Sequence, residues 1–155
     1  MFNNYAYKEY NTNSLNSKIN SANKVELVQL IYENIAQRLM RLSVIAESLV
    51  KENNYKLIKE KTELVQKVLT IIELGLLAHL DKENGKDVAK NLETFYIASI
   101  SAITQANLKN NPQEFKKLSN TYNAMGEAWK TIKIWQNHWF LPNLWYNSNK
   151  KRLRK

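Results

Sequence analysis

The spacing of apolar residues along the chain predicts four long amphipathic helices. Leucine, isoleucine, valine and aromatic residues recur three and four positions apart, which places them on one face of a helix with 3.6 residues per turn. The four segments that carry this pattern cover residues 24–51, 55–80, 88–110 and 112–136. The second is apolar over more than half of its circumference near its end, so we expect more than one neighbour to bury it.

The residues between these segments are typical of helix ends. Asn23 is followed three positions later by Glu26, a pattern that caps a helix start. Asn111 and Pro112 open the fourth segment as a cap and a first-turn proline. The polar stretch 81–87 contains Gly85, and we expect a tight turn there in which this glycine adopts a positive φ. Residues 53 and 54, both asparagine, separate the first two helices.

The resulting fold class is all-α, an antiparallel four-helix bundle. Residues 1–23 form an N-terminal arm rich in asparagine and tyrosine, residues 24–136 the bundle, and residues 137–155 a basic, aromatic C-terminal extension. Only three glycines and two prolines occur in 155 residues, which disfavours turn-rich β architectures. Short loops between long helices make neighbours antiparallel.

The chain carries no pattern of an enzyme or a metal protein. It has no cysteine, and neither of its two histidines follows a carboxylate at the spacing that di-iron bundles use. There is no glycine-rich phosphate loop and no nucleophile elbow. We expect Glu73 to be an exposed side chain and His79 to be packed or to cap a turn. The prediction is a non-catalytic protein without cofactor or metal.

The net charge of +9 is concentrated at one end. Five of the 23 basic residues lie within residues 150–155, which leaves 18 basic against 14 acidic residues elsewhere. The preceding segment is aromatic, with Trp135, Trp139 and Trp145 among its residues. Basic and aromatic residues together are suited to bind single-stranded nucleic acid or an anionic membrane surface. A nucleic-acid or anionic-surface adaptor is therefore the alternative function. No apolar run is long enough to span a membrane, and we expect a cytoplasmic location.

Several short motifs resemble one family in their order and spacing. They are Tyr10-Asn11-Thr12-Asn13-Ser14-Leu15-Asn16-Ser17, Glu26-Leu27 ahead of Ile31-Tyr32, His79-Leu80-Asp81 with Gly85, Asn91-Leu92 with Tyr96, Ala106-Asn107, and Ala128-Trp129. The chain resembles the flagellar secretion chaperone FliS from about residue 5 to 132. It departs from the family at residues 18–20, which are inserted, and at Lys24, where a proline is usual.

The resemblance implies a cytoplasmic chaperone that binds the disordered C-terminal segment of flagellin as helices in apolar grooves. Such a chaperone prevents premature polymerisation and aids type III export, as a monomer or weak homodimer, in contact with other flagellar export components. Nucleic acid is not an expected partner. The residues that the resemblance assigns to partner binding are Tyr7, Tyr10, Leu15, Leu27, Ile31, Tyr32, Leu92, Tyr96 and Trp129.

The first two helices carry more apolar residues than a four-helix core requires. The surplus positions are Val25, Val28, Val44, Val50, Ile71 and Leu74. Surplus apolar surface suits a helical partner, although scattered surface aliphatic residues are also normal. Tyr5, Tyr7, Tyr10 and Leu15 either cover this groove until flagellin displaces them or belong to a permanently docked arm.

Overall fold

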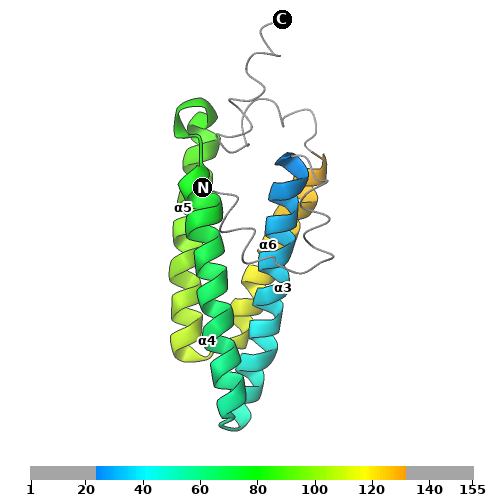
Figure 1. Ribbon diagram of the computed structural model, residues 1–155, viewed down its shortest axis with the longest axis vertical. Coiled ribbons are helices and arrows are strands. Elements are labelled where there is room, and N and C mark those ends of the chain that lie inside the picture. Colours follow the sequence, from blue (N-terminus) through cyan, green and yellow to red (C-terminus); the bar gives the residue numbers. More distant parts are fainter. Residues whose placement is uncertain (1–23, 132–155) are drawn as a thin grey trace, which may run out of the picture.

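The computed structural model describes residues 24–131, which form four long antiparallel helices (Figure 1). The elements are α3 (Lys24–Lys51), α4 (Tyr55–Thr70), the π-helical turn η1 (Ile71–Leu76), the 3-10 turn η2 (Leu77–His79), α5 (Lys82–Lys109) and α6 (Pro112–Thr131). The predicted all-α four-helix bundle is confirmed for these residues. The arm and the C-terminal extension lie outside the described residues, as do residues 132–136.

Asparagine side chains begin α4 and α6, as the sequence predicts for α6. The Asn54 side-chain oxygen accepts hydrogen bonds from the backbone N–H groups of Lys56 and Leu57, at 3.0 and 3.3 Å. The Asn111 side-chain oxygen accepts from the N–H of Glu114 at 3.2 Å, and Pro112 is the first helical residue. These caps satisfy N–H groups that have no partner within the helix.

The helices pack as two pairs, α3 with α6 and α4 with α5, joined by a common core. Buried serines fix the first pair, because Ser119 Oγ donates to the Ala36 carbonyl at 2.6 Å and Ser43 Oγ to the Pro112 carbonyl at 2.9 Å. Lys61 links the second pair by donating to the Asn107 carbonyl at the C-terminal end of α5. The two pairs diverge toward the end that holds the start of α3 and the end of α6 (Figure 1), which we call the wide end.

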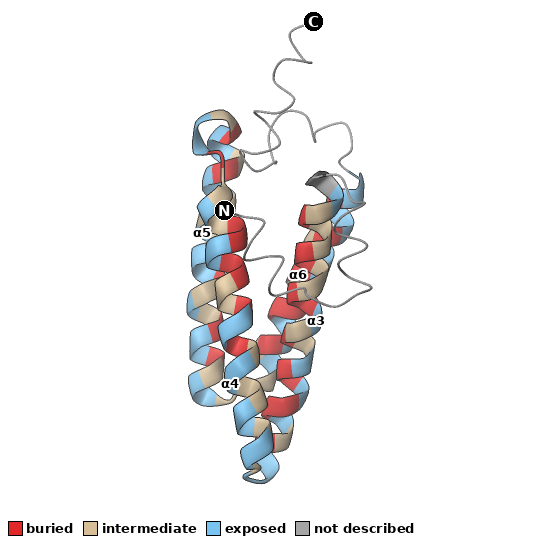
Figure 2. Cartoon of the chain, viewed as in Figure 1, coloured by how far each residue is buried: buried red, intermediate tan, exposed pale blue. Residues whose placement is uncertain are grey.

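Burial follows the predicted apolar stripes (Figure 2). Fully buried side chains come from all four α-helices and from η1, for example Leu39, Val68, Ile72, Ile103 and Phe115. Two of the surplus positions belong to this core, since Val28 and Ile71 are buried, and their assignment as surplus was wrong. Val44, Val50 and Leu74 are exposed, as expected of surplus residues. The side chain of Val25 lies outside the described residues.

The second helix is not α-helical as far as Leu80, contrary to the prediction. Regular α-helix ends at Thr70, and the N–H of Leu77 donates to the carbonyl of Ile72, five residues back, as well as to that of Glu73. Bonds over five residues define a wider, π-helical turn. This turn still buries Ile71, Ile72 and Leu76, so burial of an almost continuous apolar run outweighs regular helix geometry.

The predicted turn at Gly85 also differs from the structure. Asp81 caps α5, with its carboxylate accepting from the Asn84 N–H at 3.1 Å and from the Asn84 side chain at 2.8 Å. Helix α5 therefore begins at Lys82, and no glycine among the described residues has a positive φ. The chain reverses at Lys86 instead, where φ is 46° and ψ −125°. Gly85 is buried in the capped turn, and the positive φ occurs at the next residue, Lys86.

Replacing Lys86 by glycine should stabilise the protein. A non-glycine residue at positive φ costs about 1 to 2 kcal/mol, part of which the greater freedom of glycine in the unfolded chain offsets. We expect Lys86→Gly to raise the free energy of unfolding by about 0.5 to 1 kcal/mol in urea denaturation. The control is Lys90→Gly, at an exposed helical position of α5, which should lower it by about 1 kcal/mol. Equal destabilisation by both would contradict the assigned turn.

Candidate partner-binding site

Aromatic side chains from three helices meet in the core toward the wide end. Tyr32 of α3 packs against Tyr122 and Trp129 of α6, with ring centroids 6.0 and 6.1 Å apart. Phe95 of α5 packs against Tyr122 and Tyr96, with centroids 5.2 and 5.9 Å apart. The tilted and edge-on angles of these pairs are those that aromatic rings favour. We call these five residues the aromatic cluster, and it joins α5 to the α3–α6 pair.

The three tyrosine hydroxyls of this cluster are buried and differ in their partners. Tyr32 Oη and Tyr96 Oη are hydrogen-bonded to each other at 2.5 Å, and either can be the donor. Tyr122 Oη has no partner of acceptable geometry within the described residues. The Ser99 hydroxyl near it donates instead to the Phe95 carbonyl at 2.9 Å. The cluster therefore holds one satisfied pair and one unsatisfied hydroxyl.

Burial keeps these phenols neutral. It raises the pKa of Tyr32 to about 12, an effect that the hydrogen bond to Tyr96 partly offsets. Burial also raises the pKa values of Tyr96 and Tyr122, and the nearby Ser99 hydroxyl partly offsets this effect on the pKa of Tyr122. A phenol with a raised pKa is a poor proton acceptor and nucleophile at neutral pH. The cluster thus acts through packing and shape.

The predicted site residues divide into two groups in the structure. Ile31, Tyr32, Tyr96 and Trp129 are buried in the core, where three of them belong to the aromatic cluster. Leu27 and Leu92 are only partly buried and pack against the edge of the core. The three arm residues Tyr7, Tyr10 and Leu15 lie outside the described residues. Only Leu27 and Leu92 of the described set expose apolar surface beyond the core.

Further partly buried apolar side chains surround the core near the wide end. Together with Leu27 and Leu92 they form what we call the wide-end rim, which consists of Leu27, Leu77, Leu80, Leu92, Phe95 and Met125. The sequence pattern places Leu77, Leu80, Phe95 and Met125 in helix stripes, but the predicted site did not include them. Their apolar spacing marks a core-facing stripe, and only the angle between the helix pairs decides which members remain partly exposed.

The described residues provide little for catalysis or metal binding. Glu73 is exposed, as predicted, and His79 is half-buried in η2 with a pKa lowered by burial. Within residues 24–131 no group of three or more histidine, aspartate or glutamate side chains could hold a metal ion. None of the helices in that range is long and apolar enough to cross a membrane.

An antiparallel helical bundle with an apolar rim has the features of a protein-binding module. The model of the flagellar protein FliS family matches residues 6–136. The flagellar secretion chaperone FliS of Salmonella typhimurium is 30% identical over 125 residues, which cover 81% of this chain and 87% of the relative. That of Vibrio cholerae is 32% identical over 127 residues, covering 82% and 85%. That of Campylobacter jejuni is 30% identical over 132 residues, covering 85% and 94%. The chain belongs to the FliS family of flagellar secretion chaperones.

Removing single hydroxyls from the aromatic cluster should have opposite effects on stability. Tyr122→Phe deletes an unsatisfied buried hydroxyl, so we expect the free energy of unfolding to stay equal or to rise by up to about 1 kcal/mol. Tyr96→Phe leaves the Tyr32 hydroxyl without its buried partner and should lower it by about 1 to 3 kcal/mol. Urea denaturation followed by circular dichroism measures both. A larger loss for Tyr122→Phe than for Tyr96→Phe would contradict the assigned hydrogen bond.

Alkaline pH should destabilise the fold through Tyr32. Its pKa is about 12 in the folded protein and near 10 in the unfolded chain. The unfolded chain therefore loses this proton first, and the stabilising contribution is complete below about pH 10 and disappears as pH rises toward 12. We expect the urea midpoint to fall between about pH 9 and about pH 11. Tyr32→Phe should lessen this fall, whereas an unchanged slope would exclude the contribution.

Proposed function

We propose that the protein is a cytoplasmic export chaperone for flagellin. It binds the disordered C-terminal segment of flagellin as helices, prevents premature polymerisation, and aids delivery to the type III export apparatus. Membership of the FliS family supports the class of partner. The wide-end rim is the observation that carries the binding mode, because it offers partly exposed apolar side chains from α3, η2, α5 and α6 around one part of the core.

Apolar side chains of this kind suit the amphipathic helix of a filament-forming protein. In a filament, such a helix buries its apolar face against neighbouring subunits, and a chaperone that covers the same face competes with assembly. The segment loses conformational entropy when it becomes helical, so the apolar surface that it buries must offset that cost. Leucine, phenylalanine and methionine provide such area, and flexible methionine adapts to an imperfect fit.

The predicted binding residues take two roles in this proposal. Leu27 and Leu92 of the rim contact flagellin directly. Ile31, Tyr32, Tyr96 and Trp129 are positioning residues, because their packing in the core fixes where the helices of the wide end lie. Tyr7, Tyr10 and Leu15 of the arm cover the rim in the free chaperone and are displaced by flagellin. Other export components bind outside the rim, and the protein acts without catalysis as a monomer or weak homodimer.

A glutamate in the rim should weaken binding to flagellin. Leu92→Glu places a charge where the proposal buries an apolar helix face, so we expect at least about tenfold weaker binding of a flagellin C-terminal peptide. The matched control is Leu108→Glu on the same helix, where the leucine is 74% exposed and outside the rim. It should change affinity less than about twofold. Isothermal calorimetry measures the affinity, and circular dichroism checks that both variants fold.

The same titrations distinguish apolar docking from binding through the C-terminal tail. Apolar burial gives a negative heat-capacity change and depends little on salt, whereas charge-driven binding weakens steeply with salt. Truncation after Gln136 should leave flagellin binding intact. If the peptide does not bind and the tail alone binds an oligonucleotide, the export-chaperone proposal fails.

A further inference from the structure

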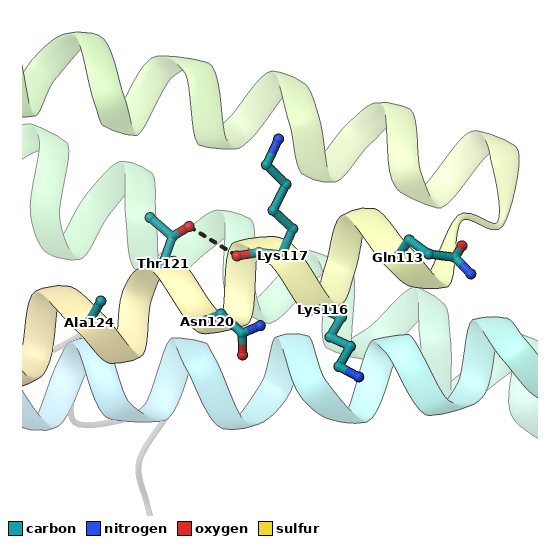
Figure 3. A pocket seen from close by; sticks show the side chains of 6 residues that line it. All are labelled: Gln113, Lys116, Lys117, Asn120, Thr121 and Ala124. Atoms are coloured by element: carbon teal, nitrogen blue, oxygen red, sulfur yellow. Dashed lines mark hydrogen bonds between the residues drawn. The ribbon is translucent and has the colours of Figure 1, made fainter.

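The outer face of α6 carries a surface that the proposed flagellin site does not use. A shallow depression of about 550 Å³ runs along this face from Gln113 to Ala124 (Figure 3). A second depression of about 490 Å³ lies beside it, between the end of α3 and the connection from α5 to α6. Gln113 lines both, so the two adjoin at this residue. None of the wide-end rim residues lines either one.

Positive charge dominates the charged side chains that line these two depressions. Lys116 and Lys117 line the first depression, and Lys51 and Lys109 line the second. Glu47 is the only carboxylate that lines either depression. None of the four lysines forms an ion pair with a carboxylate within the described residues.

Two of these lysines have a structural explanation and two do not. Lys51 and Lys109 lie in the last turns of α3 and α5, where the helix dipole favours a cation. Lys116 and Lys117 lie in the second turn of α6, near the helix end where the dipole favours an anion. Figure 3 shows Lys117 extending toward α5 and Lys116 toward α3, so both sides of the depression are cationic. The positive helix start and the lysines thus add their potentials.

The remaining lining favours a protein partner over nucleic acid. No aromatic residue lines either depression, so bases have no stacking platform. The neutral polar residues are mainly amides, such as Asn120 and Gln113, which can both donate and accept hydrogen bonds. Val50, Pro112 and Ala124 supply small apolar contacts at intervals. From Gln113 to Ala124 the face is about 17 Å long, enough for three turns of a partner helix.

We propose that this basic face of α6 docks an acidic helical segment of a second partner protein while the rim holds flagellin. Carboxylates of the segment pair with Lys116, Lys117 and the two lysines of the adjoining depression, and its small side chains contact Ala124 and Val50. The proposal goes beyond the proposed function, because neither surface needs the other and both can be occupied at once.

A labelled synthetic peptide tests this docking directly. The probe is a helical peptide of about 20 residues with glutamates three and four positions apart and alanines between them, and its control carries glutamine for glutamate. We expect the acidic peptide to bind the full chain in fluorescence anisotropy, the glutamine peptide to bind at least about tenfold more weakly, and the affinity to fall with added salt. Backbone amide shifts in NMR should change at Lys116, Asn120 and Thr121.

Charge reversal with a matched control separates a specific site from general attraction to a basic protein. Lys116→Glu with Lys117→Glu should weaken the acidic peptide at least about tenfold. Lys56→Glu with Lys59→Glu changes the net charge equally at exposed positions of α4 and should weaken it less than about twofold. The first pair should leave the flagellin peptide's affinity unchanged, which keeps this test independent of the rim.

Several outcomes would overturn the proposal. Absence of binding by the acidic peptide, equal losses for the two charge reversals, or equal binding of the glutamine peptide would each do so. Tighter binding of a 20-nucleotide thymidine strand than of the peptide, lost in the Lys116 and Lys117 variant, would assign the face to nucleic acid instead.

Discussion

The hydrogen bond between Tyr32 and Tyr96 is the interaction on which the arrangement of the wide end depends. It joins two residues 64 positions apart in the sequence and lies in a core from which water is excluded. Each hydroxyl is costly to bury alone and inexpensive to bury with its partner. The pair therefore specifies how α5 sits against α3, since sliding either helix would leave two polar groups unsatisfied. The neighbouring rings of Phe95 and Tyr122 add packing but not this selectivity.

The contact of α5 with the α3–α6 pair depends on the same cluster. Helices α3 and α6 are held by Ser119, which is bonded to the backbone of α3, and by the packing of Tyr32 on Tyr122 and Trp129. Helix α5 reaches this pair near the wide end through the rings of Phe95 and Tyr96. Neighbouring leucines and a methionine there stay only partly covered. The apolar rim thus lies where the helix pairs diverge, and the basic face of α6 is free because α6 buries its opposite side against α3.

The sequence predicts the helices well because burial imposes a 3.6-residue period, and the order of apolar and polar residues along the chain shows this period directly. It also predicts the caps of α6, since asparagine and proline act locally. It could not predict Lys86, because a glycine next to it carries the stronger local signal for positive φ. The candidate site was only partly predictable for a related reason. Leu27 and Tyr32 occupy equally apolar positions of one helix, and only the placement of α5 decides that one remains partly exposed and the other is buried.

The π-helical turn η1 lets the two rim leucines after it keep their direction although the chain carries one residue more than an α-helix needs there. A wider turn accommodates this additional residue, and each residue of a regular α-helix advances it by about 100°. Losing a single amino acid between Ile71 and Leu76 would therefore restore an ordinary helix and leave Leu77 and Leu80 in their present direction. The same loss in the regular part of α4 would rotate both leucines and alter the shape of the wide end.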